Sequence, residues 1–297
     1  LKHQKLRRIM QTVENVTSQH GDATLLCEKW DVLILVITSL IFLLGFIGNL
    51  ITASKVIIEK KLHKPVPVCI SCLAIADLLT LCFQYARVPL SHCRIEVSIS
   101  TRETFLNLTA IMVHSSAMHI ILLALIRYGL IVHPFTMKYW LTSGKVVIAS
   151  LSFWLLSLAM GLLYGLYNRQ YYLGNIDEHT DAIVQLTIAL YILIVPICFF
   201  ASLYVVEMKV MRKSLLPEKS FYIKKISKMI SLIMVLYIAF LAPYVIADSL
   251  RLLYMKEILS MDQRRFETMK NVMFNLARVF ILLNYSINPF VYFLFIR

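Results

Sequence analysis

The chain has 297 residues, of which 59% are hydrophobic and 16% are charged, and its mean hydropathy is +0.73. A soluble domain is about 45–50% apolar and about 25% charged, so this excess cannot be buried in one core and much of it must face lipid; a disordered chain, a collagen and a disulfide-rich scaffold are excluded as well. The formal net charge of +13 would suggest nucleic acid as the partner of a soluble protein, but its placement along this chain indicates membrane topology and no nucleic-acid partner.

Seven apolar segments follow one another along the chain. Each is about as long as the roughly 20 residues that a helix needs to cross the hydrocarbon core. They cover residues 32–54, 66–86, 104–126, 146–168, 182–206, 229–247 and 271–296. Periods near 10 residues, which are typical of membrane β-barrels, are absent. The sequence therefore predicts an all-α membrane protein, with a seven-transmembrane-helix bundle at 32–297 preceded by a tail at 1–31.

The basic residues fall mainly on one side of the predicted membrane. One set of connections, with the C-terminus, carries 15 basic and three acidic residues, whereas the opposite set, with the N-terminal tail, carries 14 basic and 13 acidic residues. Since cytoplasmic loops are enriched in Lys and Arg, we expect an extracellular N-terminus, a cytoplasmic C-terminus and a multi-pass protein of the plasma membrane. Asn15, two residues before Thr17, is then a candidate glycosylation site. The tail has no apolar region typical of a signal peptide, so we expect the first span to act as the anchor.

Polar residues and prolines inside the spans are the strongest functional signal, because polar groups are costly in lipid. In chain order these markers are Gly48-Asn49, Asp77, Arg127-Tyr128 before His133-Pro134-Phe135, Trp154, Pro196 with Tyr204, Pro243, and Asn288-Pro289 with Tyr292. Their order resembles the rhodopsin-like (class A) G-protein-coupled receptors, over Val32 to Arg297. The resemblance implies a cell-surface receptor, not an enzyme, that binds an extracellular ligand and activates a heterotrimeric G protein.

The resemblance also implies roles for single residues. Arg127 and Tyr128 would lie at the G-protein interface, where Arg127 would contact Tyr204 and the C-terminal helix of a Gα subunit in the active state. Tyr292 would help to hold that state, Pro243 would act as a hinge, and Pro289 would permit a kink. The basic cytoplasmic rim would attract anionic membrane lipids.

Asp77 is a carboxylate at mid-membrane depth, where it needs partners or a cation. By resemblance, the oxygens around it would come from Ser116, Asn284 and Asn288, which would form a sodium site. The alternative is a protonated or hydrogen-bonded Asp77 that only ties helices together. No cofactor other than this sodium ion is expected.

Three departures from the family pattern affect the expected switch. Ile126 stands where an acid normally restrains Arg127, which predicts appreciable basal activity. Leu241 replaces a tryptophan of the sixth helix, and Arg102 replaces the cysteine of the usual extracellular disulfide. We therefore expect Cys27 and Cys93, both on the oxidising side, to form a disulfide instead. The cysteines expected to be free are Cys69, Cys72, Cys82 and Cys198.

The ligand is less well defined. Thr109 replaces the aspartate of amine receptors, and Leu282 replaces the retinal lysine, so a biogenic amine and an opsin are disfavoured. By family register, the pocket residues are Gln84, Arg87, Thr109, Tyr164, Gln185, Tyr244, Asp248 and Arg278. The two arginines favour a peptide, lipid or small molecule with a carboxylate or phosphate group. Alternatively, they pair with Asp248 and Glu103.

Two other classes of function were considered. A heptahelical transporter or ion pump would need a chain of acids across the membrane, yet only Asp77 and Arg278 are charged within the predicted spans. A membrane hydrolase would need paired acids or metal-binding histidines. His114 and His119 are five residues apart, share no helix face, and are expected to be satisfied by hydrogen bonds. Stimulated nucleotide exchange on a G protein fits only the receptor.

Overall fold

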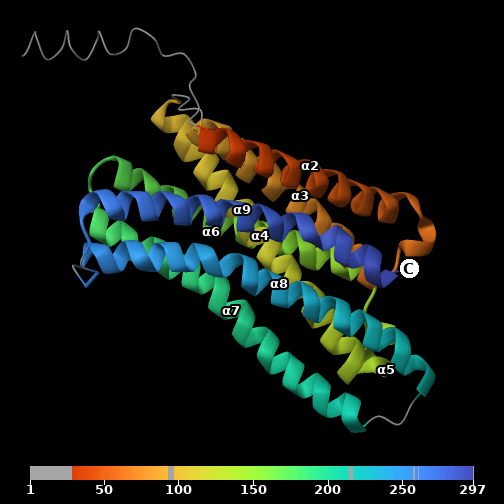
Figure 1. Ribbon diagram of the computed structural model, residues 1–297. Coiled ribbons are helices and arrows are strands. Elements are labelled where there is room, and N and C mark those ends of the chain that lie inside the picture. Colours follow the sequence, from red (N-terminus) through yellow and green to blue (C-terminus); the bar gives the residue numbers. More distant parts are fainter. Residues whose placement is uncertain (1–28, 93–96, 214–216, 257, 260, 297) are drawn as a thin grey trace, which may run out of the picture.

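The computed structural model describes residues 29–92, 97–213, 217–256, 258–259 and 261–296 (Figure 1). These described residues form eight α-helices and one short 3-10 helix, and they contain no β-strand. The elements are α2 (Lys29–Ile58), η1 (Lys60–Leu62), α3 (Pro65–His92), α4 (Ile99–Val132), α5 (Pro134–Trp140), α6 (Ser143–Tyr172), α7 (Glu178–Lys213), α8 (Pro217–Met255) and α9 (Gln263–Ile296).

Seven of these helices, all except α5, are long and apolar enough to cross a membrane. The predicted fold class, an all-α bundle of seven membrane helices, is therefore confirmed. Each helix extends beyond its predicted span. The spans were predicted from apolar residues alone, whereas the ends of the helices also contain polar residues that cap or prolong them. At the start of α7, for example, the Asp177 carboxylate accepts hydrogen bonds from Thr180 Oγ1 at 2.6 Å and Thr180 N at 3.0 Å, which holds the pKa of Asp177 below its usual value.

The long helices alternate in direction, and α4 lies at the centre, where it contacts α3, α6, α7 and α8. We call the end of the bundle at which α4 begins the Gln263 end, after the first residue of α9. The opposite end, where α4 stops, is the Arg127 end. In Figure 1, α7 leans away from the bundle toward the Arg127 end, and α5 lies at that end. The helix α5 was not predicted; Pro134 starts it at a position where a missing N–H is tolerated.

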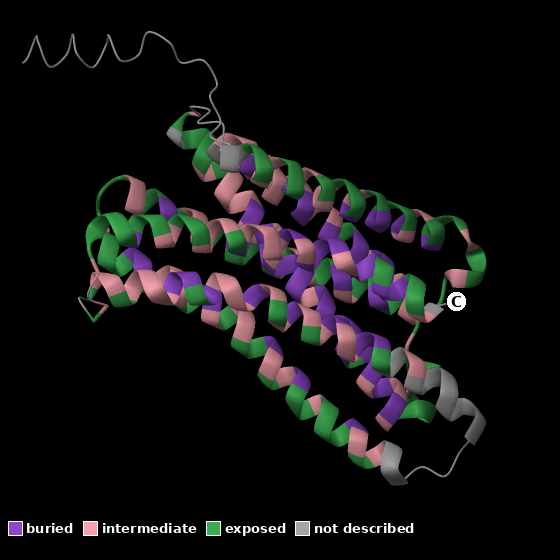
Figure 2. Ribbon diagram, viewed as in Figure 1, coloured by how far each residue is buried: buried purple, intermediate pink, exposed green. Residues whose placement is uncertain are grey.

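Buried residues gather toward the middle of the bundle and exposed residues lie on its outside (Figure 2). Many of the exposed residues are large and apolar. The main buried cluster is rich in Leu and Ile and includes Leu73, Leu123 and Ile233. Leu44, Leu155 and many similar residues are exposed on the outer surface. Because an apolar exterior is stable only against lipid, this pattern is that of a multi-pass membrane protein.

The helices α2 and α9 approach each other closely through small residues. A Cβ atom added to Gly45 would lie 2.8 Å from the Cα atom of Ser286 on α9, so only glycine fits at this position. One turn further along α2, the Asn49 Nδ2 atom donates hydrogen bonds at 2.9 Å to the Gly45 and Tyr285 carbonyl oxygens. Asn49 therefore ties the two helices together at the marker position found in the sequence.

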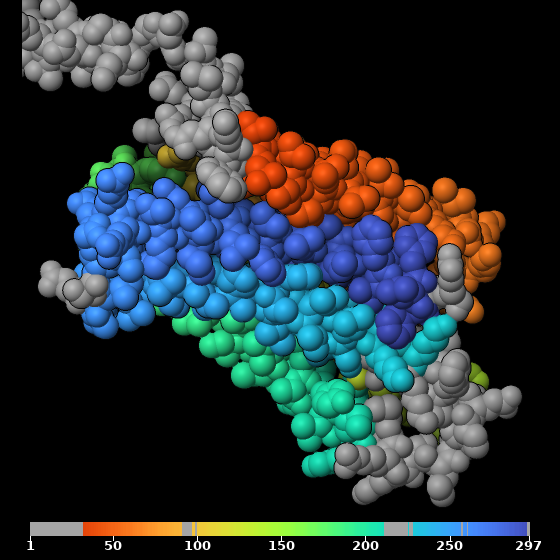
Figure 3. Space-filling view, viewed as in Figure 1, coloured from red at the N-terminus to blue at the C-terminus, as the bar shows by residue number. Residues whose placement is uncertain are grey.

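The helices α8 and α9 run side by side across one face of the bundle (Figure 3). At the Gln263 end they are joined by the stacked rings of Tyr254 and Phe266, whose centroids are 3.5 Å apart and whose planes differ by 7°. Phe266 is buried in this contact. Aromatic stacking therefore adds to the ordinary packing between the two helices at this end.

Cys69, Cys72, Cys82 and Cys198 are free thiols, as predicted. Cys27, Cys93 and Asn15 lie outside the described residues. The disulfide between Cys27 and Cys93 and the glycosylation of Asn15 therefore stay predictions.

Candidate functional site

A cavity of about 770 Å³ lies between α3, α4, α6, α7, α8 and α9, toward the Gln263 end. It contains most of the residues that family register assigned to a ligand pocket. Seven of these eight residues line it, namely Gln84, Arg87, Thr109, Tyr164, Gln185, Tyr244 and Arg278. The fold thus brings together residues from six helices that are up to 194 positions apart in the sequence.

Asp248 is the exception, because it lies outside the lining of the cavity. It is one turn further along α8 than Tyr244, which lines the cavity and hydrogen-bonds to the Asp248 carboxyl group. The side chain of Asp248 is buried and lies close to Arg251, the arginine one turn beyond it. Asp248 therefore does not line this cavity, and its carboxyl group lies near Tyr244 and Arg251 of its own helix and Asp181 of α7.

Three arginines line the cavity, and no carboxylate does among its described lining residues. Arg87 comes from α3, Arg102 from α4 and Arg278 from α9. Arg278 is partly buried, and its Nη1 donates to Asn275 Oδ1 at 3.3 Å. Arg102 was noted in the sequence only because it replaces a cysteine. Its spacing of seven residues from Thr109 puts both on one face of α4, which is the signal that could have found it.

The opposite wall is held by hydrogen bonds between α6, α7 and α8. Tyr164 Oη donates to Gln185 Oε1 at 3.2 Å, and Gln185 Nε2 donates to Asp181 Oδ1 at 3.3 Å. Arg251 on α8 completes this network through its ion pair with Asp181, at 3.3 Å. Thr109 is satisfied within α4, because its hydroxyl donates to the Phe105 carbonyl oxygen at 2.6 Å.

The two histidines of α4 are both buried, but they differ in their hydrogen bonds. His119 is satisfied at both ring nitrogens, by the Ser115 carbonyl oxygen and by Ser150 Oγ, each at 2.7 Å. His114 lines the cavity and contacts Ser157 Oγ through Nδ1 at 2.9 Å, whereas its Nε2 has no partner among the described residues. The prediction of satisfied histidines is confirmed for His119 and wrong for His114.

Asp77 is completely buried between α3, α4 and α9. Ser116 donates a hydrogen bond to one carboxylate oxygen, and Asn288 Nδ2 donates to the other at 2.7 Å. Asn284 instead interacts with Tyr285. No Lys or Arg of the described chain forms an ion pair with Asp77, so the carboxylate still needs a proton or a cation. The set can accept a hard cation because Asp77 and Ser116 offer oxygens, although Asn288 directs its nitrogen toward the carboxylate.

Arg127 lies at the opposite end of α4, in a buried ion pair with Glu207 of α7. The distance from Arg127 Nη2 to Glu207 Oε2 is 2.6 Å, and the two side chains are 3% and 2% exposed. Arg127 Nη1 also donates to Ser231 Oγ on α8 at 3.1 Å. The expectation that no acid restrains Arg127 is therefore wrong, because α7 supplies the acid that position 126 lacks.

The burial of Glu207 on α7, though not its pairing with Arg127, could have been predicted from the sequence. Pro196, Phe200 and Glu207 recur at helical spacing, and all three are buried on the inner face of α7. Tyr204, which the resemblance pairs with Arg127, lies three residues before Glu207 and close enough to Arg127 to interact with it electrostatically, although its side chain is 45% exposed.

The other switch residues are placed as follows. Tyr128 packs edge-on against His133, with ring centroids 6.2 Å apart, and the Tyr292 hydroxyl is buried with no hydrogen-bond partner among the described residues. Pro243 and Pro289 lie within α8 and α9.

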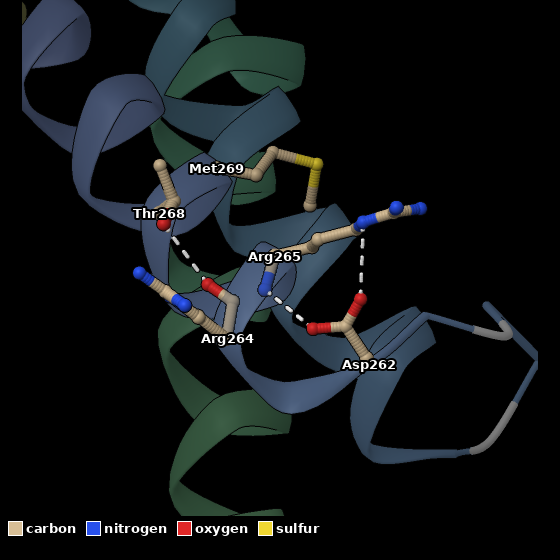
Figure 4. A pocket seen from close by; sticks show the side chains of 5 residues that line it. All are labelled: Asp262, Arg264, Arg265, Thr268 and Met269. Atoms are coloured by element: carbon tan, nitrogen blue, oxygen red, sulfur yellow. Dashed lines mark hydrogen bonds and ion pairs between the residues drawn. The ribbon is translucent and has the colours of Figure 1, made fainter.

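A second depression lies at the start of α9, on the surface of the Gln263 end (Figure 4). Here Asp262 caps the helix, accepting a hydrogen bond from Arg265 N at 2.9 Å and forming an ion pair with Arg265 Nε at 3.1 Å. Thr268 donates to the Arg264 carbonyl oxygen at 2.9 Å. All of its lining residues come from one segment of chain, so this depression is a helix cap rather than a ligand site.

The sequence that forms this bundle matches a known family of proteins. Residues 48–292 match the family described as "7 transmembrane receptor (rhodopsin family)", and the chain belongs to this family. The chain is also 28% identical over 134 residues to the cholecystokinin receptor type A of Oryctolagus cuniculus. That match covers 44% of this chain and 31% of the receptor, so the chain spans about a third of the length of this curated relative. The resemblance found from the marker residues is confirmed, and the chain is a receptor of the G-protein-coupled class.

Proposed function

We propose that this chain is a plasma-membrane receptor that binds an extracellular ligand with an anionic group and activates a heterotrimeric G protein. The observation that carries the proposal is the set of three arginines, Arg87, Arg102 and Arg278, in a cavity without a lining carboxylate among the described residues. Arg87 and Arg278 are close enough to repel each other, an anion between them would offset that repulsion, and each guanidinium group can hold a carboxylate or phosphate bidentately.

In this proposal the Gln263 end is extracellular and the Arg127 end is cytoplasmic. The support is the charge asymmetry of the connections, with 15 basic and three acidic residues on one side. Ligand and G protein then bind at opposite ends of the bundle, and α8, which contains Pro243, connects them. The exposed lysines of the cytoplasmic face also suit anionic lipid headgroups.

The Arg127–Glu207 ion pair serves as the resting restraint of the G-protein site. To contact a Gα subunit, Arg127 must leave Glu207 and Ser231, and Tyr128, Tyr204, Tyr292 and Pro289 would support the rearranged state as the family resemblance implies. Since the ion pair lowers the energy of the resting state, we infer low basal activity, contrary to the expectation from Ile126 alone.

We further propose that a sodium ion binds beside Asp77 and Ser116 and supplies the positive charge that the buried carboxylate lacks. Asn288 would then turn its amide oxygen toward the ion, and Asn284 would contribute only if it left Tyr285. The alternative, a protonated Asp77 that ties α3 to α4 and α9, uses the same hydrogen bonds.

The test uses purified receptor in lipid nanodiscs with a panel of Gα subunits. Dodecanoic acid and dodecylamine have equal chains and opposite charges, so comparing their binding isolates the preference for an anion. We expect binding of the acid over the amine by the parent, and a loss of about tenfold or more in affinity in Arg87→Lys, Arg102→Lys or Arg278→Lys. The exposed Arg264→Lys is the matched control. Equal binding of acid and amine would overturn the anion proposal.

Coupling is measured separately as nucleotide exchange on the Gα panel, without added ligand. We expect exchange above that of empty nanodiscs for at least one Gα subunit once the Arg127 restraint is removed by Glu207→Gln. A transporter or pump would leave exchange unchanged for every subunit, and that result would contradict the receptor function.

A further inference from the structure

His114 combines two features found together at no other lining residue described here. Its ring borders the cavity, and its buried Nε2 has no hydrogen-bond partner among the described residues. His119, five residues further along the same helix, has both nitrogens paired. The unpaired ring nitrogen of His114 is therefore specific to this site, since the other histidine of α4 has no such nitrogen.

The hydrogen bonds around Ser157 determine which nitrogen of His114 carries the proton. Ser157 Oγ donates its only hydrogen to the Phe153 carbonyl oxygen, at 2.7 Å. Toward His114 it can therefore act only as an acceptor, and the 2.9 Å contact must be donated by His114 Nδ1–H. In the neutral ring, Nε2 is then a bare acceptor. A buried acceptor without a partner destabilises the empty site, and a ligand donor would relieve that penalty.

The depth of His114 relative to the arginines follows from the contacts of Asp77. Because Asp77 contacts Ser116 and Asn288, these three residues lie at one level of the bundle. Arg87 is ten residues from Asp77 and Arg278 is ten residues from Asn288, which puts both about 15 Å above that level at 1.5 Å per residue. His114 is two residues from Ser116, about 3 Å above it. Arg87 and Arg278 are thus separated from His114 by about 12 Å of depth, and Arg102, twelve residues before His114 on α4, by about 18 Å.

The cavity wall between these two levels is mostly apolar. Val113, Ile281, Leu282 and Leu241 belong to it, and Gln84 and Thr109 are the polar lining residues of α3 and α4 between these levels. A ligand that reaches from the arginines to His114 must therefore have an apolar middle, because a polar group there would lose its hydrogen bonds to water.

We propose that the ligand is an elongated acid whose anionic group binds the arginines and whose far end donates a hydrogen bond from an O–H or N–H group to His114 Nε2. The proposal rests on the proposed function of the cavity and adds the chemistry of its deep end. His114 is then a specificity-determining residue, which separates a hydroxyl- or amide-terminated acid from a plain acid of the same length.

The tautomer is tested without any ligand. In receptor with isotope-labelled histidine nitrogens, the signals that disappear in His114→Asn belong to His114. We expect the pattern of a neutral ring protonated at Nδ1. A ring protonated at Nε2 would overturn the proposal, because that nitrogen could not accept a hydrogen bond.

The specificity is tested with dodecanoic acid, ω-hydroxydodecanoic acid and ω-methoxydodecanoic acid on receptor in nanodiscs. The methyl ether has the oxygen but no donor. We expect the hydroxy acid to bind about fivefold more tightly than the other two, within the range of one net hydrogen bond. Two variants separate the roles of the ring nitrogens. Asn at position 114 can still donate to Ser157 but lacks the deep acceptor, whereas Gln carries an acceptor near the position of Nε2.

The hydroxyl preference should disappear in His114→Asn and persist in His114→Gln, while all acids keep their dependence on Arg278. Equal binding of the three acids by the parent overturns the role of His114 and leaves the anion proposal intact. A hydroxyl preference that persists in His114→Asn also overturns it. Failure of every acid to bind overturns both proposals.

Discussion

The charged side chain of Arg127 is only 3% exposed, and a charge buried to this extent is stable only with a partner of opposite charge. Glu207 provides this partner from a different helix. Removing one member of such a pair leaves the other charge unpaired, which typically costs about 3–5 kcal/mol. In the proposed function, the same removal would free Arg127 for a G protein. Stability and signalling should therefore change in opposite directions at this pair.

Glu207→Gln should raise ligand-independent nucleotide exchange about 5- to 150-fold, corresponding to roughly 1–3 kcal/mol of bias toward the active state. It should also lower the apparent melting temperature. Glu267→Gln, which alters an exposed helix-surface pair with Lys270, is the matched control and should change neither quantity. Ile126→Asp should reduce whatever basal exchange the parent shows. Unchanged exchange in Glu207→Gln would contradict the assignment of Glu207 as the restraint.

Asp77 should make the thermal stability of the receptor depend on sodium. A ligand that binds only the folded state raises its stability, so the parent should melt at a higher temperature in sodium chloride than in N-methyl-D-glucamine chloride of equal ionic strength. Asp77→Asn keeps the shape of the side chain but removes its charge, and should abolish the difference. If the parent melts at the same temperature in both salts, the hydrogen-bonded tie without an ion is the correct description.

For single residues, the sequence was enough to locate the polar side chains that are energetically costly in lipid, but not all of their partners. Asp77 and its contacts with Ser116 and Asn288 followed from family register, because each lies at a marked position of its helix. Glu207 and His114 did not, since their roles depend on which side chain faces which across the bundle. That pairing is decided by helix rotation and packing, to which a single polar residue in an apolar run gives little clue.

The helices themselves were predictable because an apolar segment of membrane length has few alternatives to a helix in lipid. What the apolar windows could not give was their ends. The helix α7 continues to Lys213, and α5 forms from a seven-residue segment with no apolar run of its own. Both depend on local capping and on charged residues that a membrane span does not require.

The close packing of α2 on α9 should be sensitive to one methyl group. Gly45→Ala would place a Cβ atom 2.8 Å from the Cα atom of Ser286, so one of the two backbones must move. We expect a destabilisation of about 1–3 kcal/mol, measured as a lower apparent melting temperature in nanodiscs. Gly144→Ala, where nothing lies within 4 Å of the added Cβ, is the control and should be neutral or slightly stabilising. Equal melting of the two variants would mean that α2 is not held by this contact.

For the whole molecule, composition alone separated this chain from soluble proteins, and the markers then selected one family among membrane bundles. The orientation of the bundle in the membrane is predicted from the distribution of charge alone. It predicts that the tail with Asn15 lies outside the cell, where the sequon can be used.

Glycosylation tests this orientation. The full chain expressed in animal cells should lose apparent mass on treatment with an N-glycosidase, and Asn15→Gln should have the lower mass without treatment. Thr17→Ala is the second variant, since it removes the same sequon through a different residue. If the mass of the parent is insensitive to the enzyme, antibody access to a tag at the N-terminus of intact cells decides the side. A tag reached only after permeabilisation would reverse the proposed orientation.

The stacking of Tyr254 on Phe266 holds the Gln263 end of α8 against α9. With Tyr254 held against α9, a bend at Pro243 would move the part of α8 on the other side of the proline, in which Lys228 lies about 22 Å from Pro243. A rotation of this part of α8 by about 10° would then move Lys228 by about 4 Å, whereas the side chains near Pro243 would hardly change position. In the proposed receptor, small adjustments around a bound ligand would thus be converted into a larger displacement of this part of α8, where Ser231 contacts Arg127.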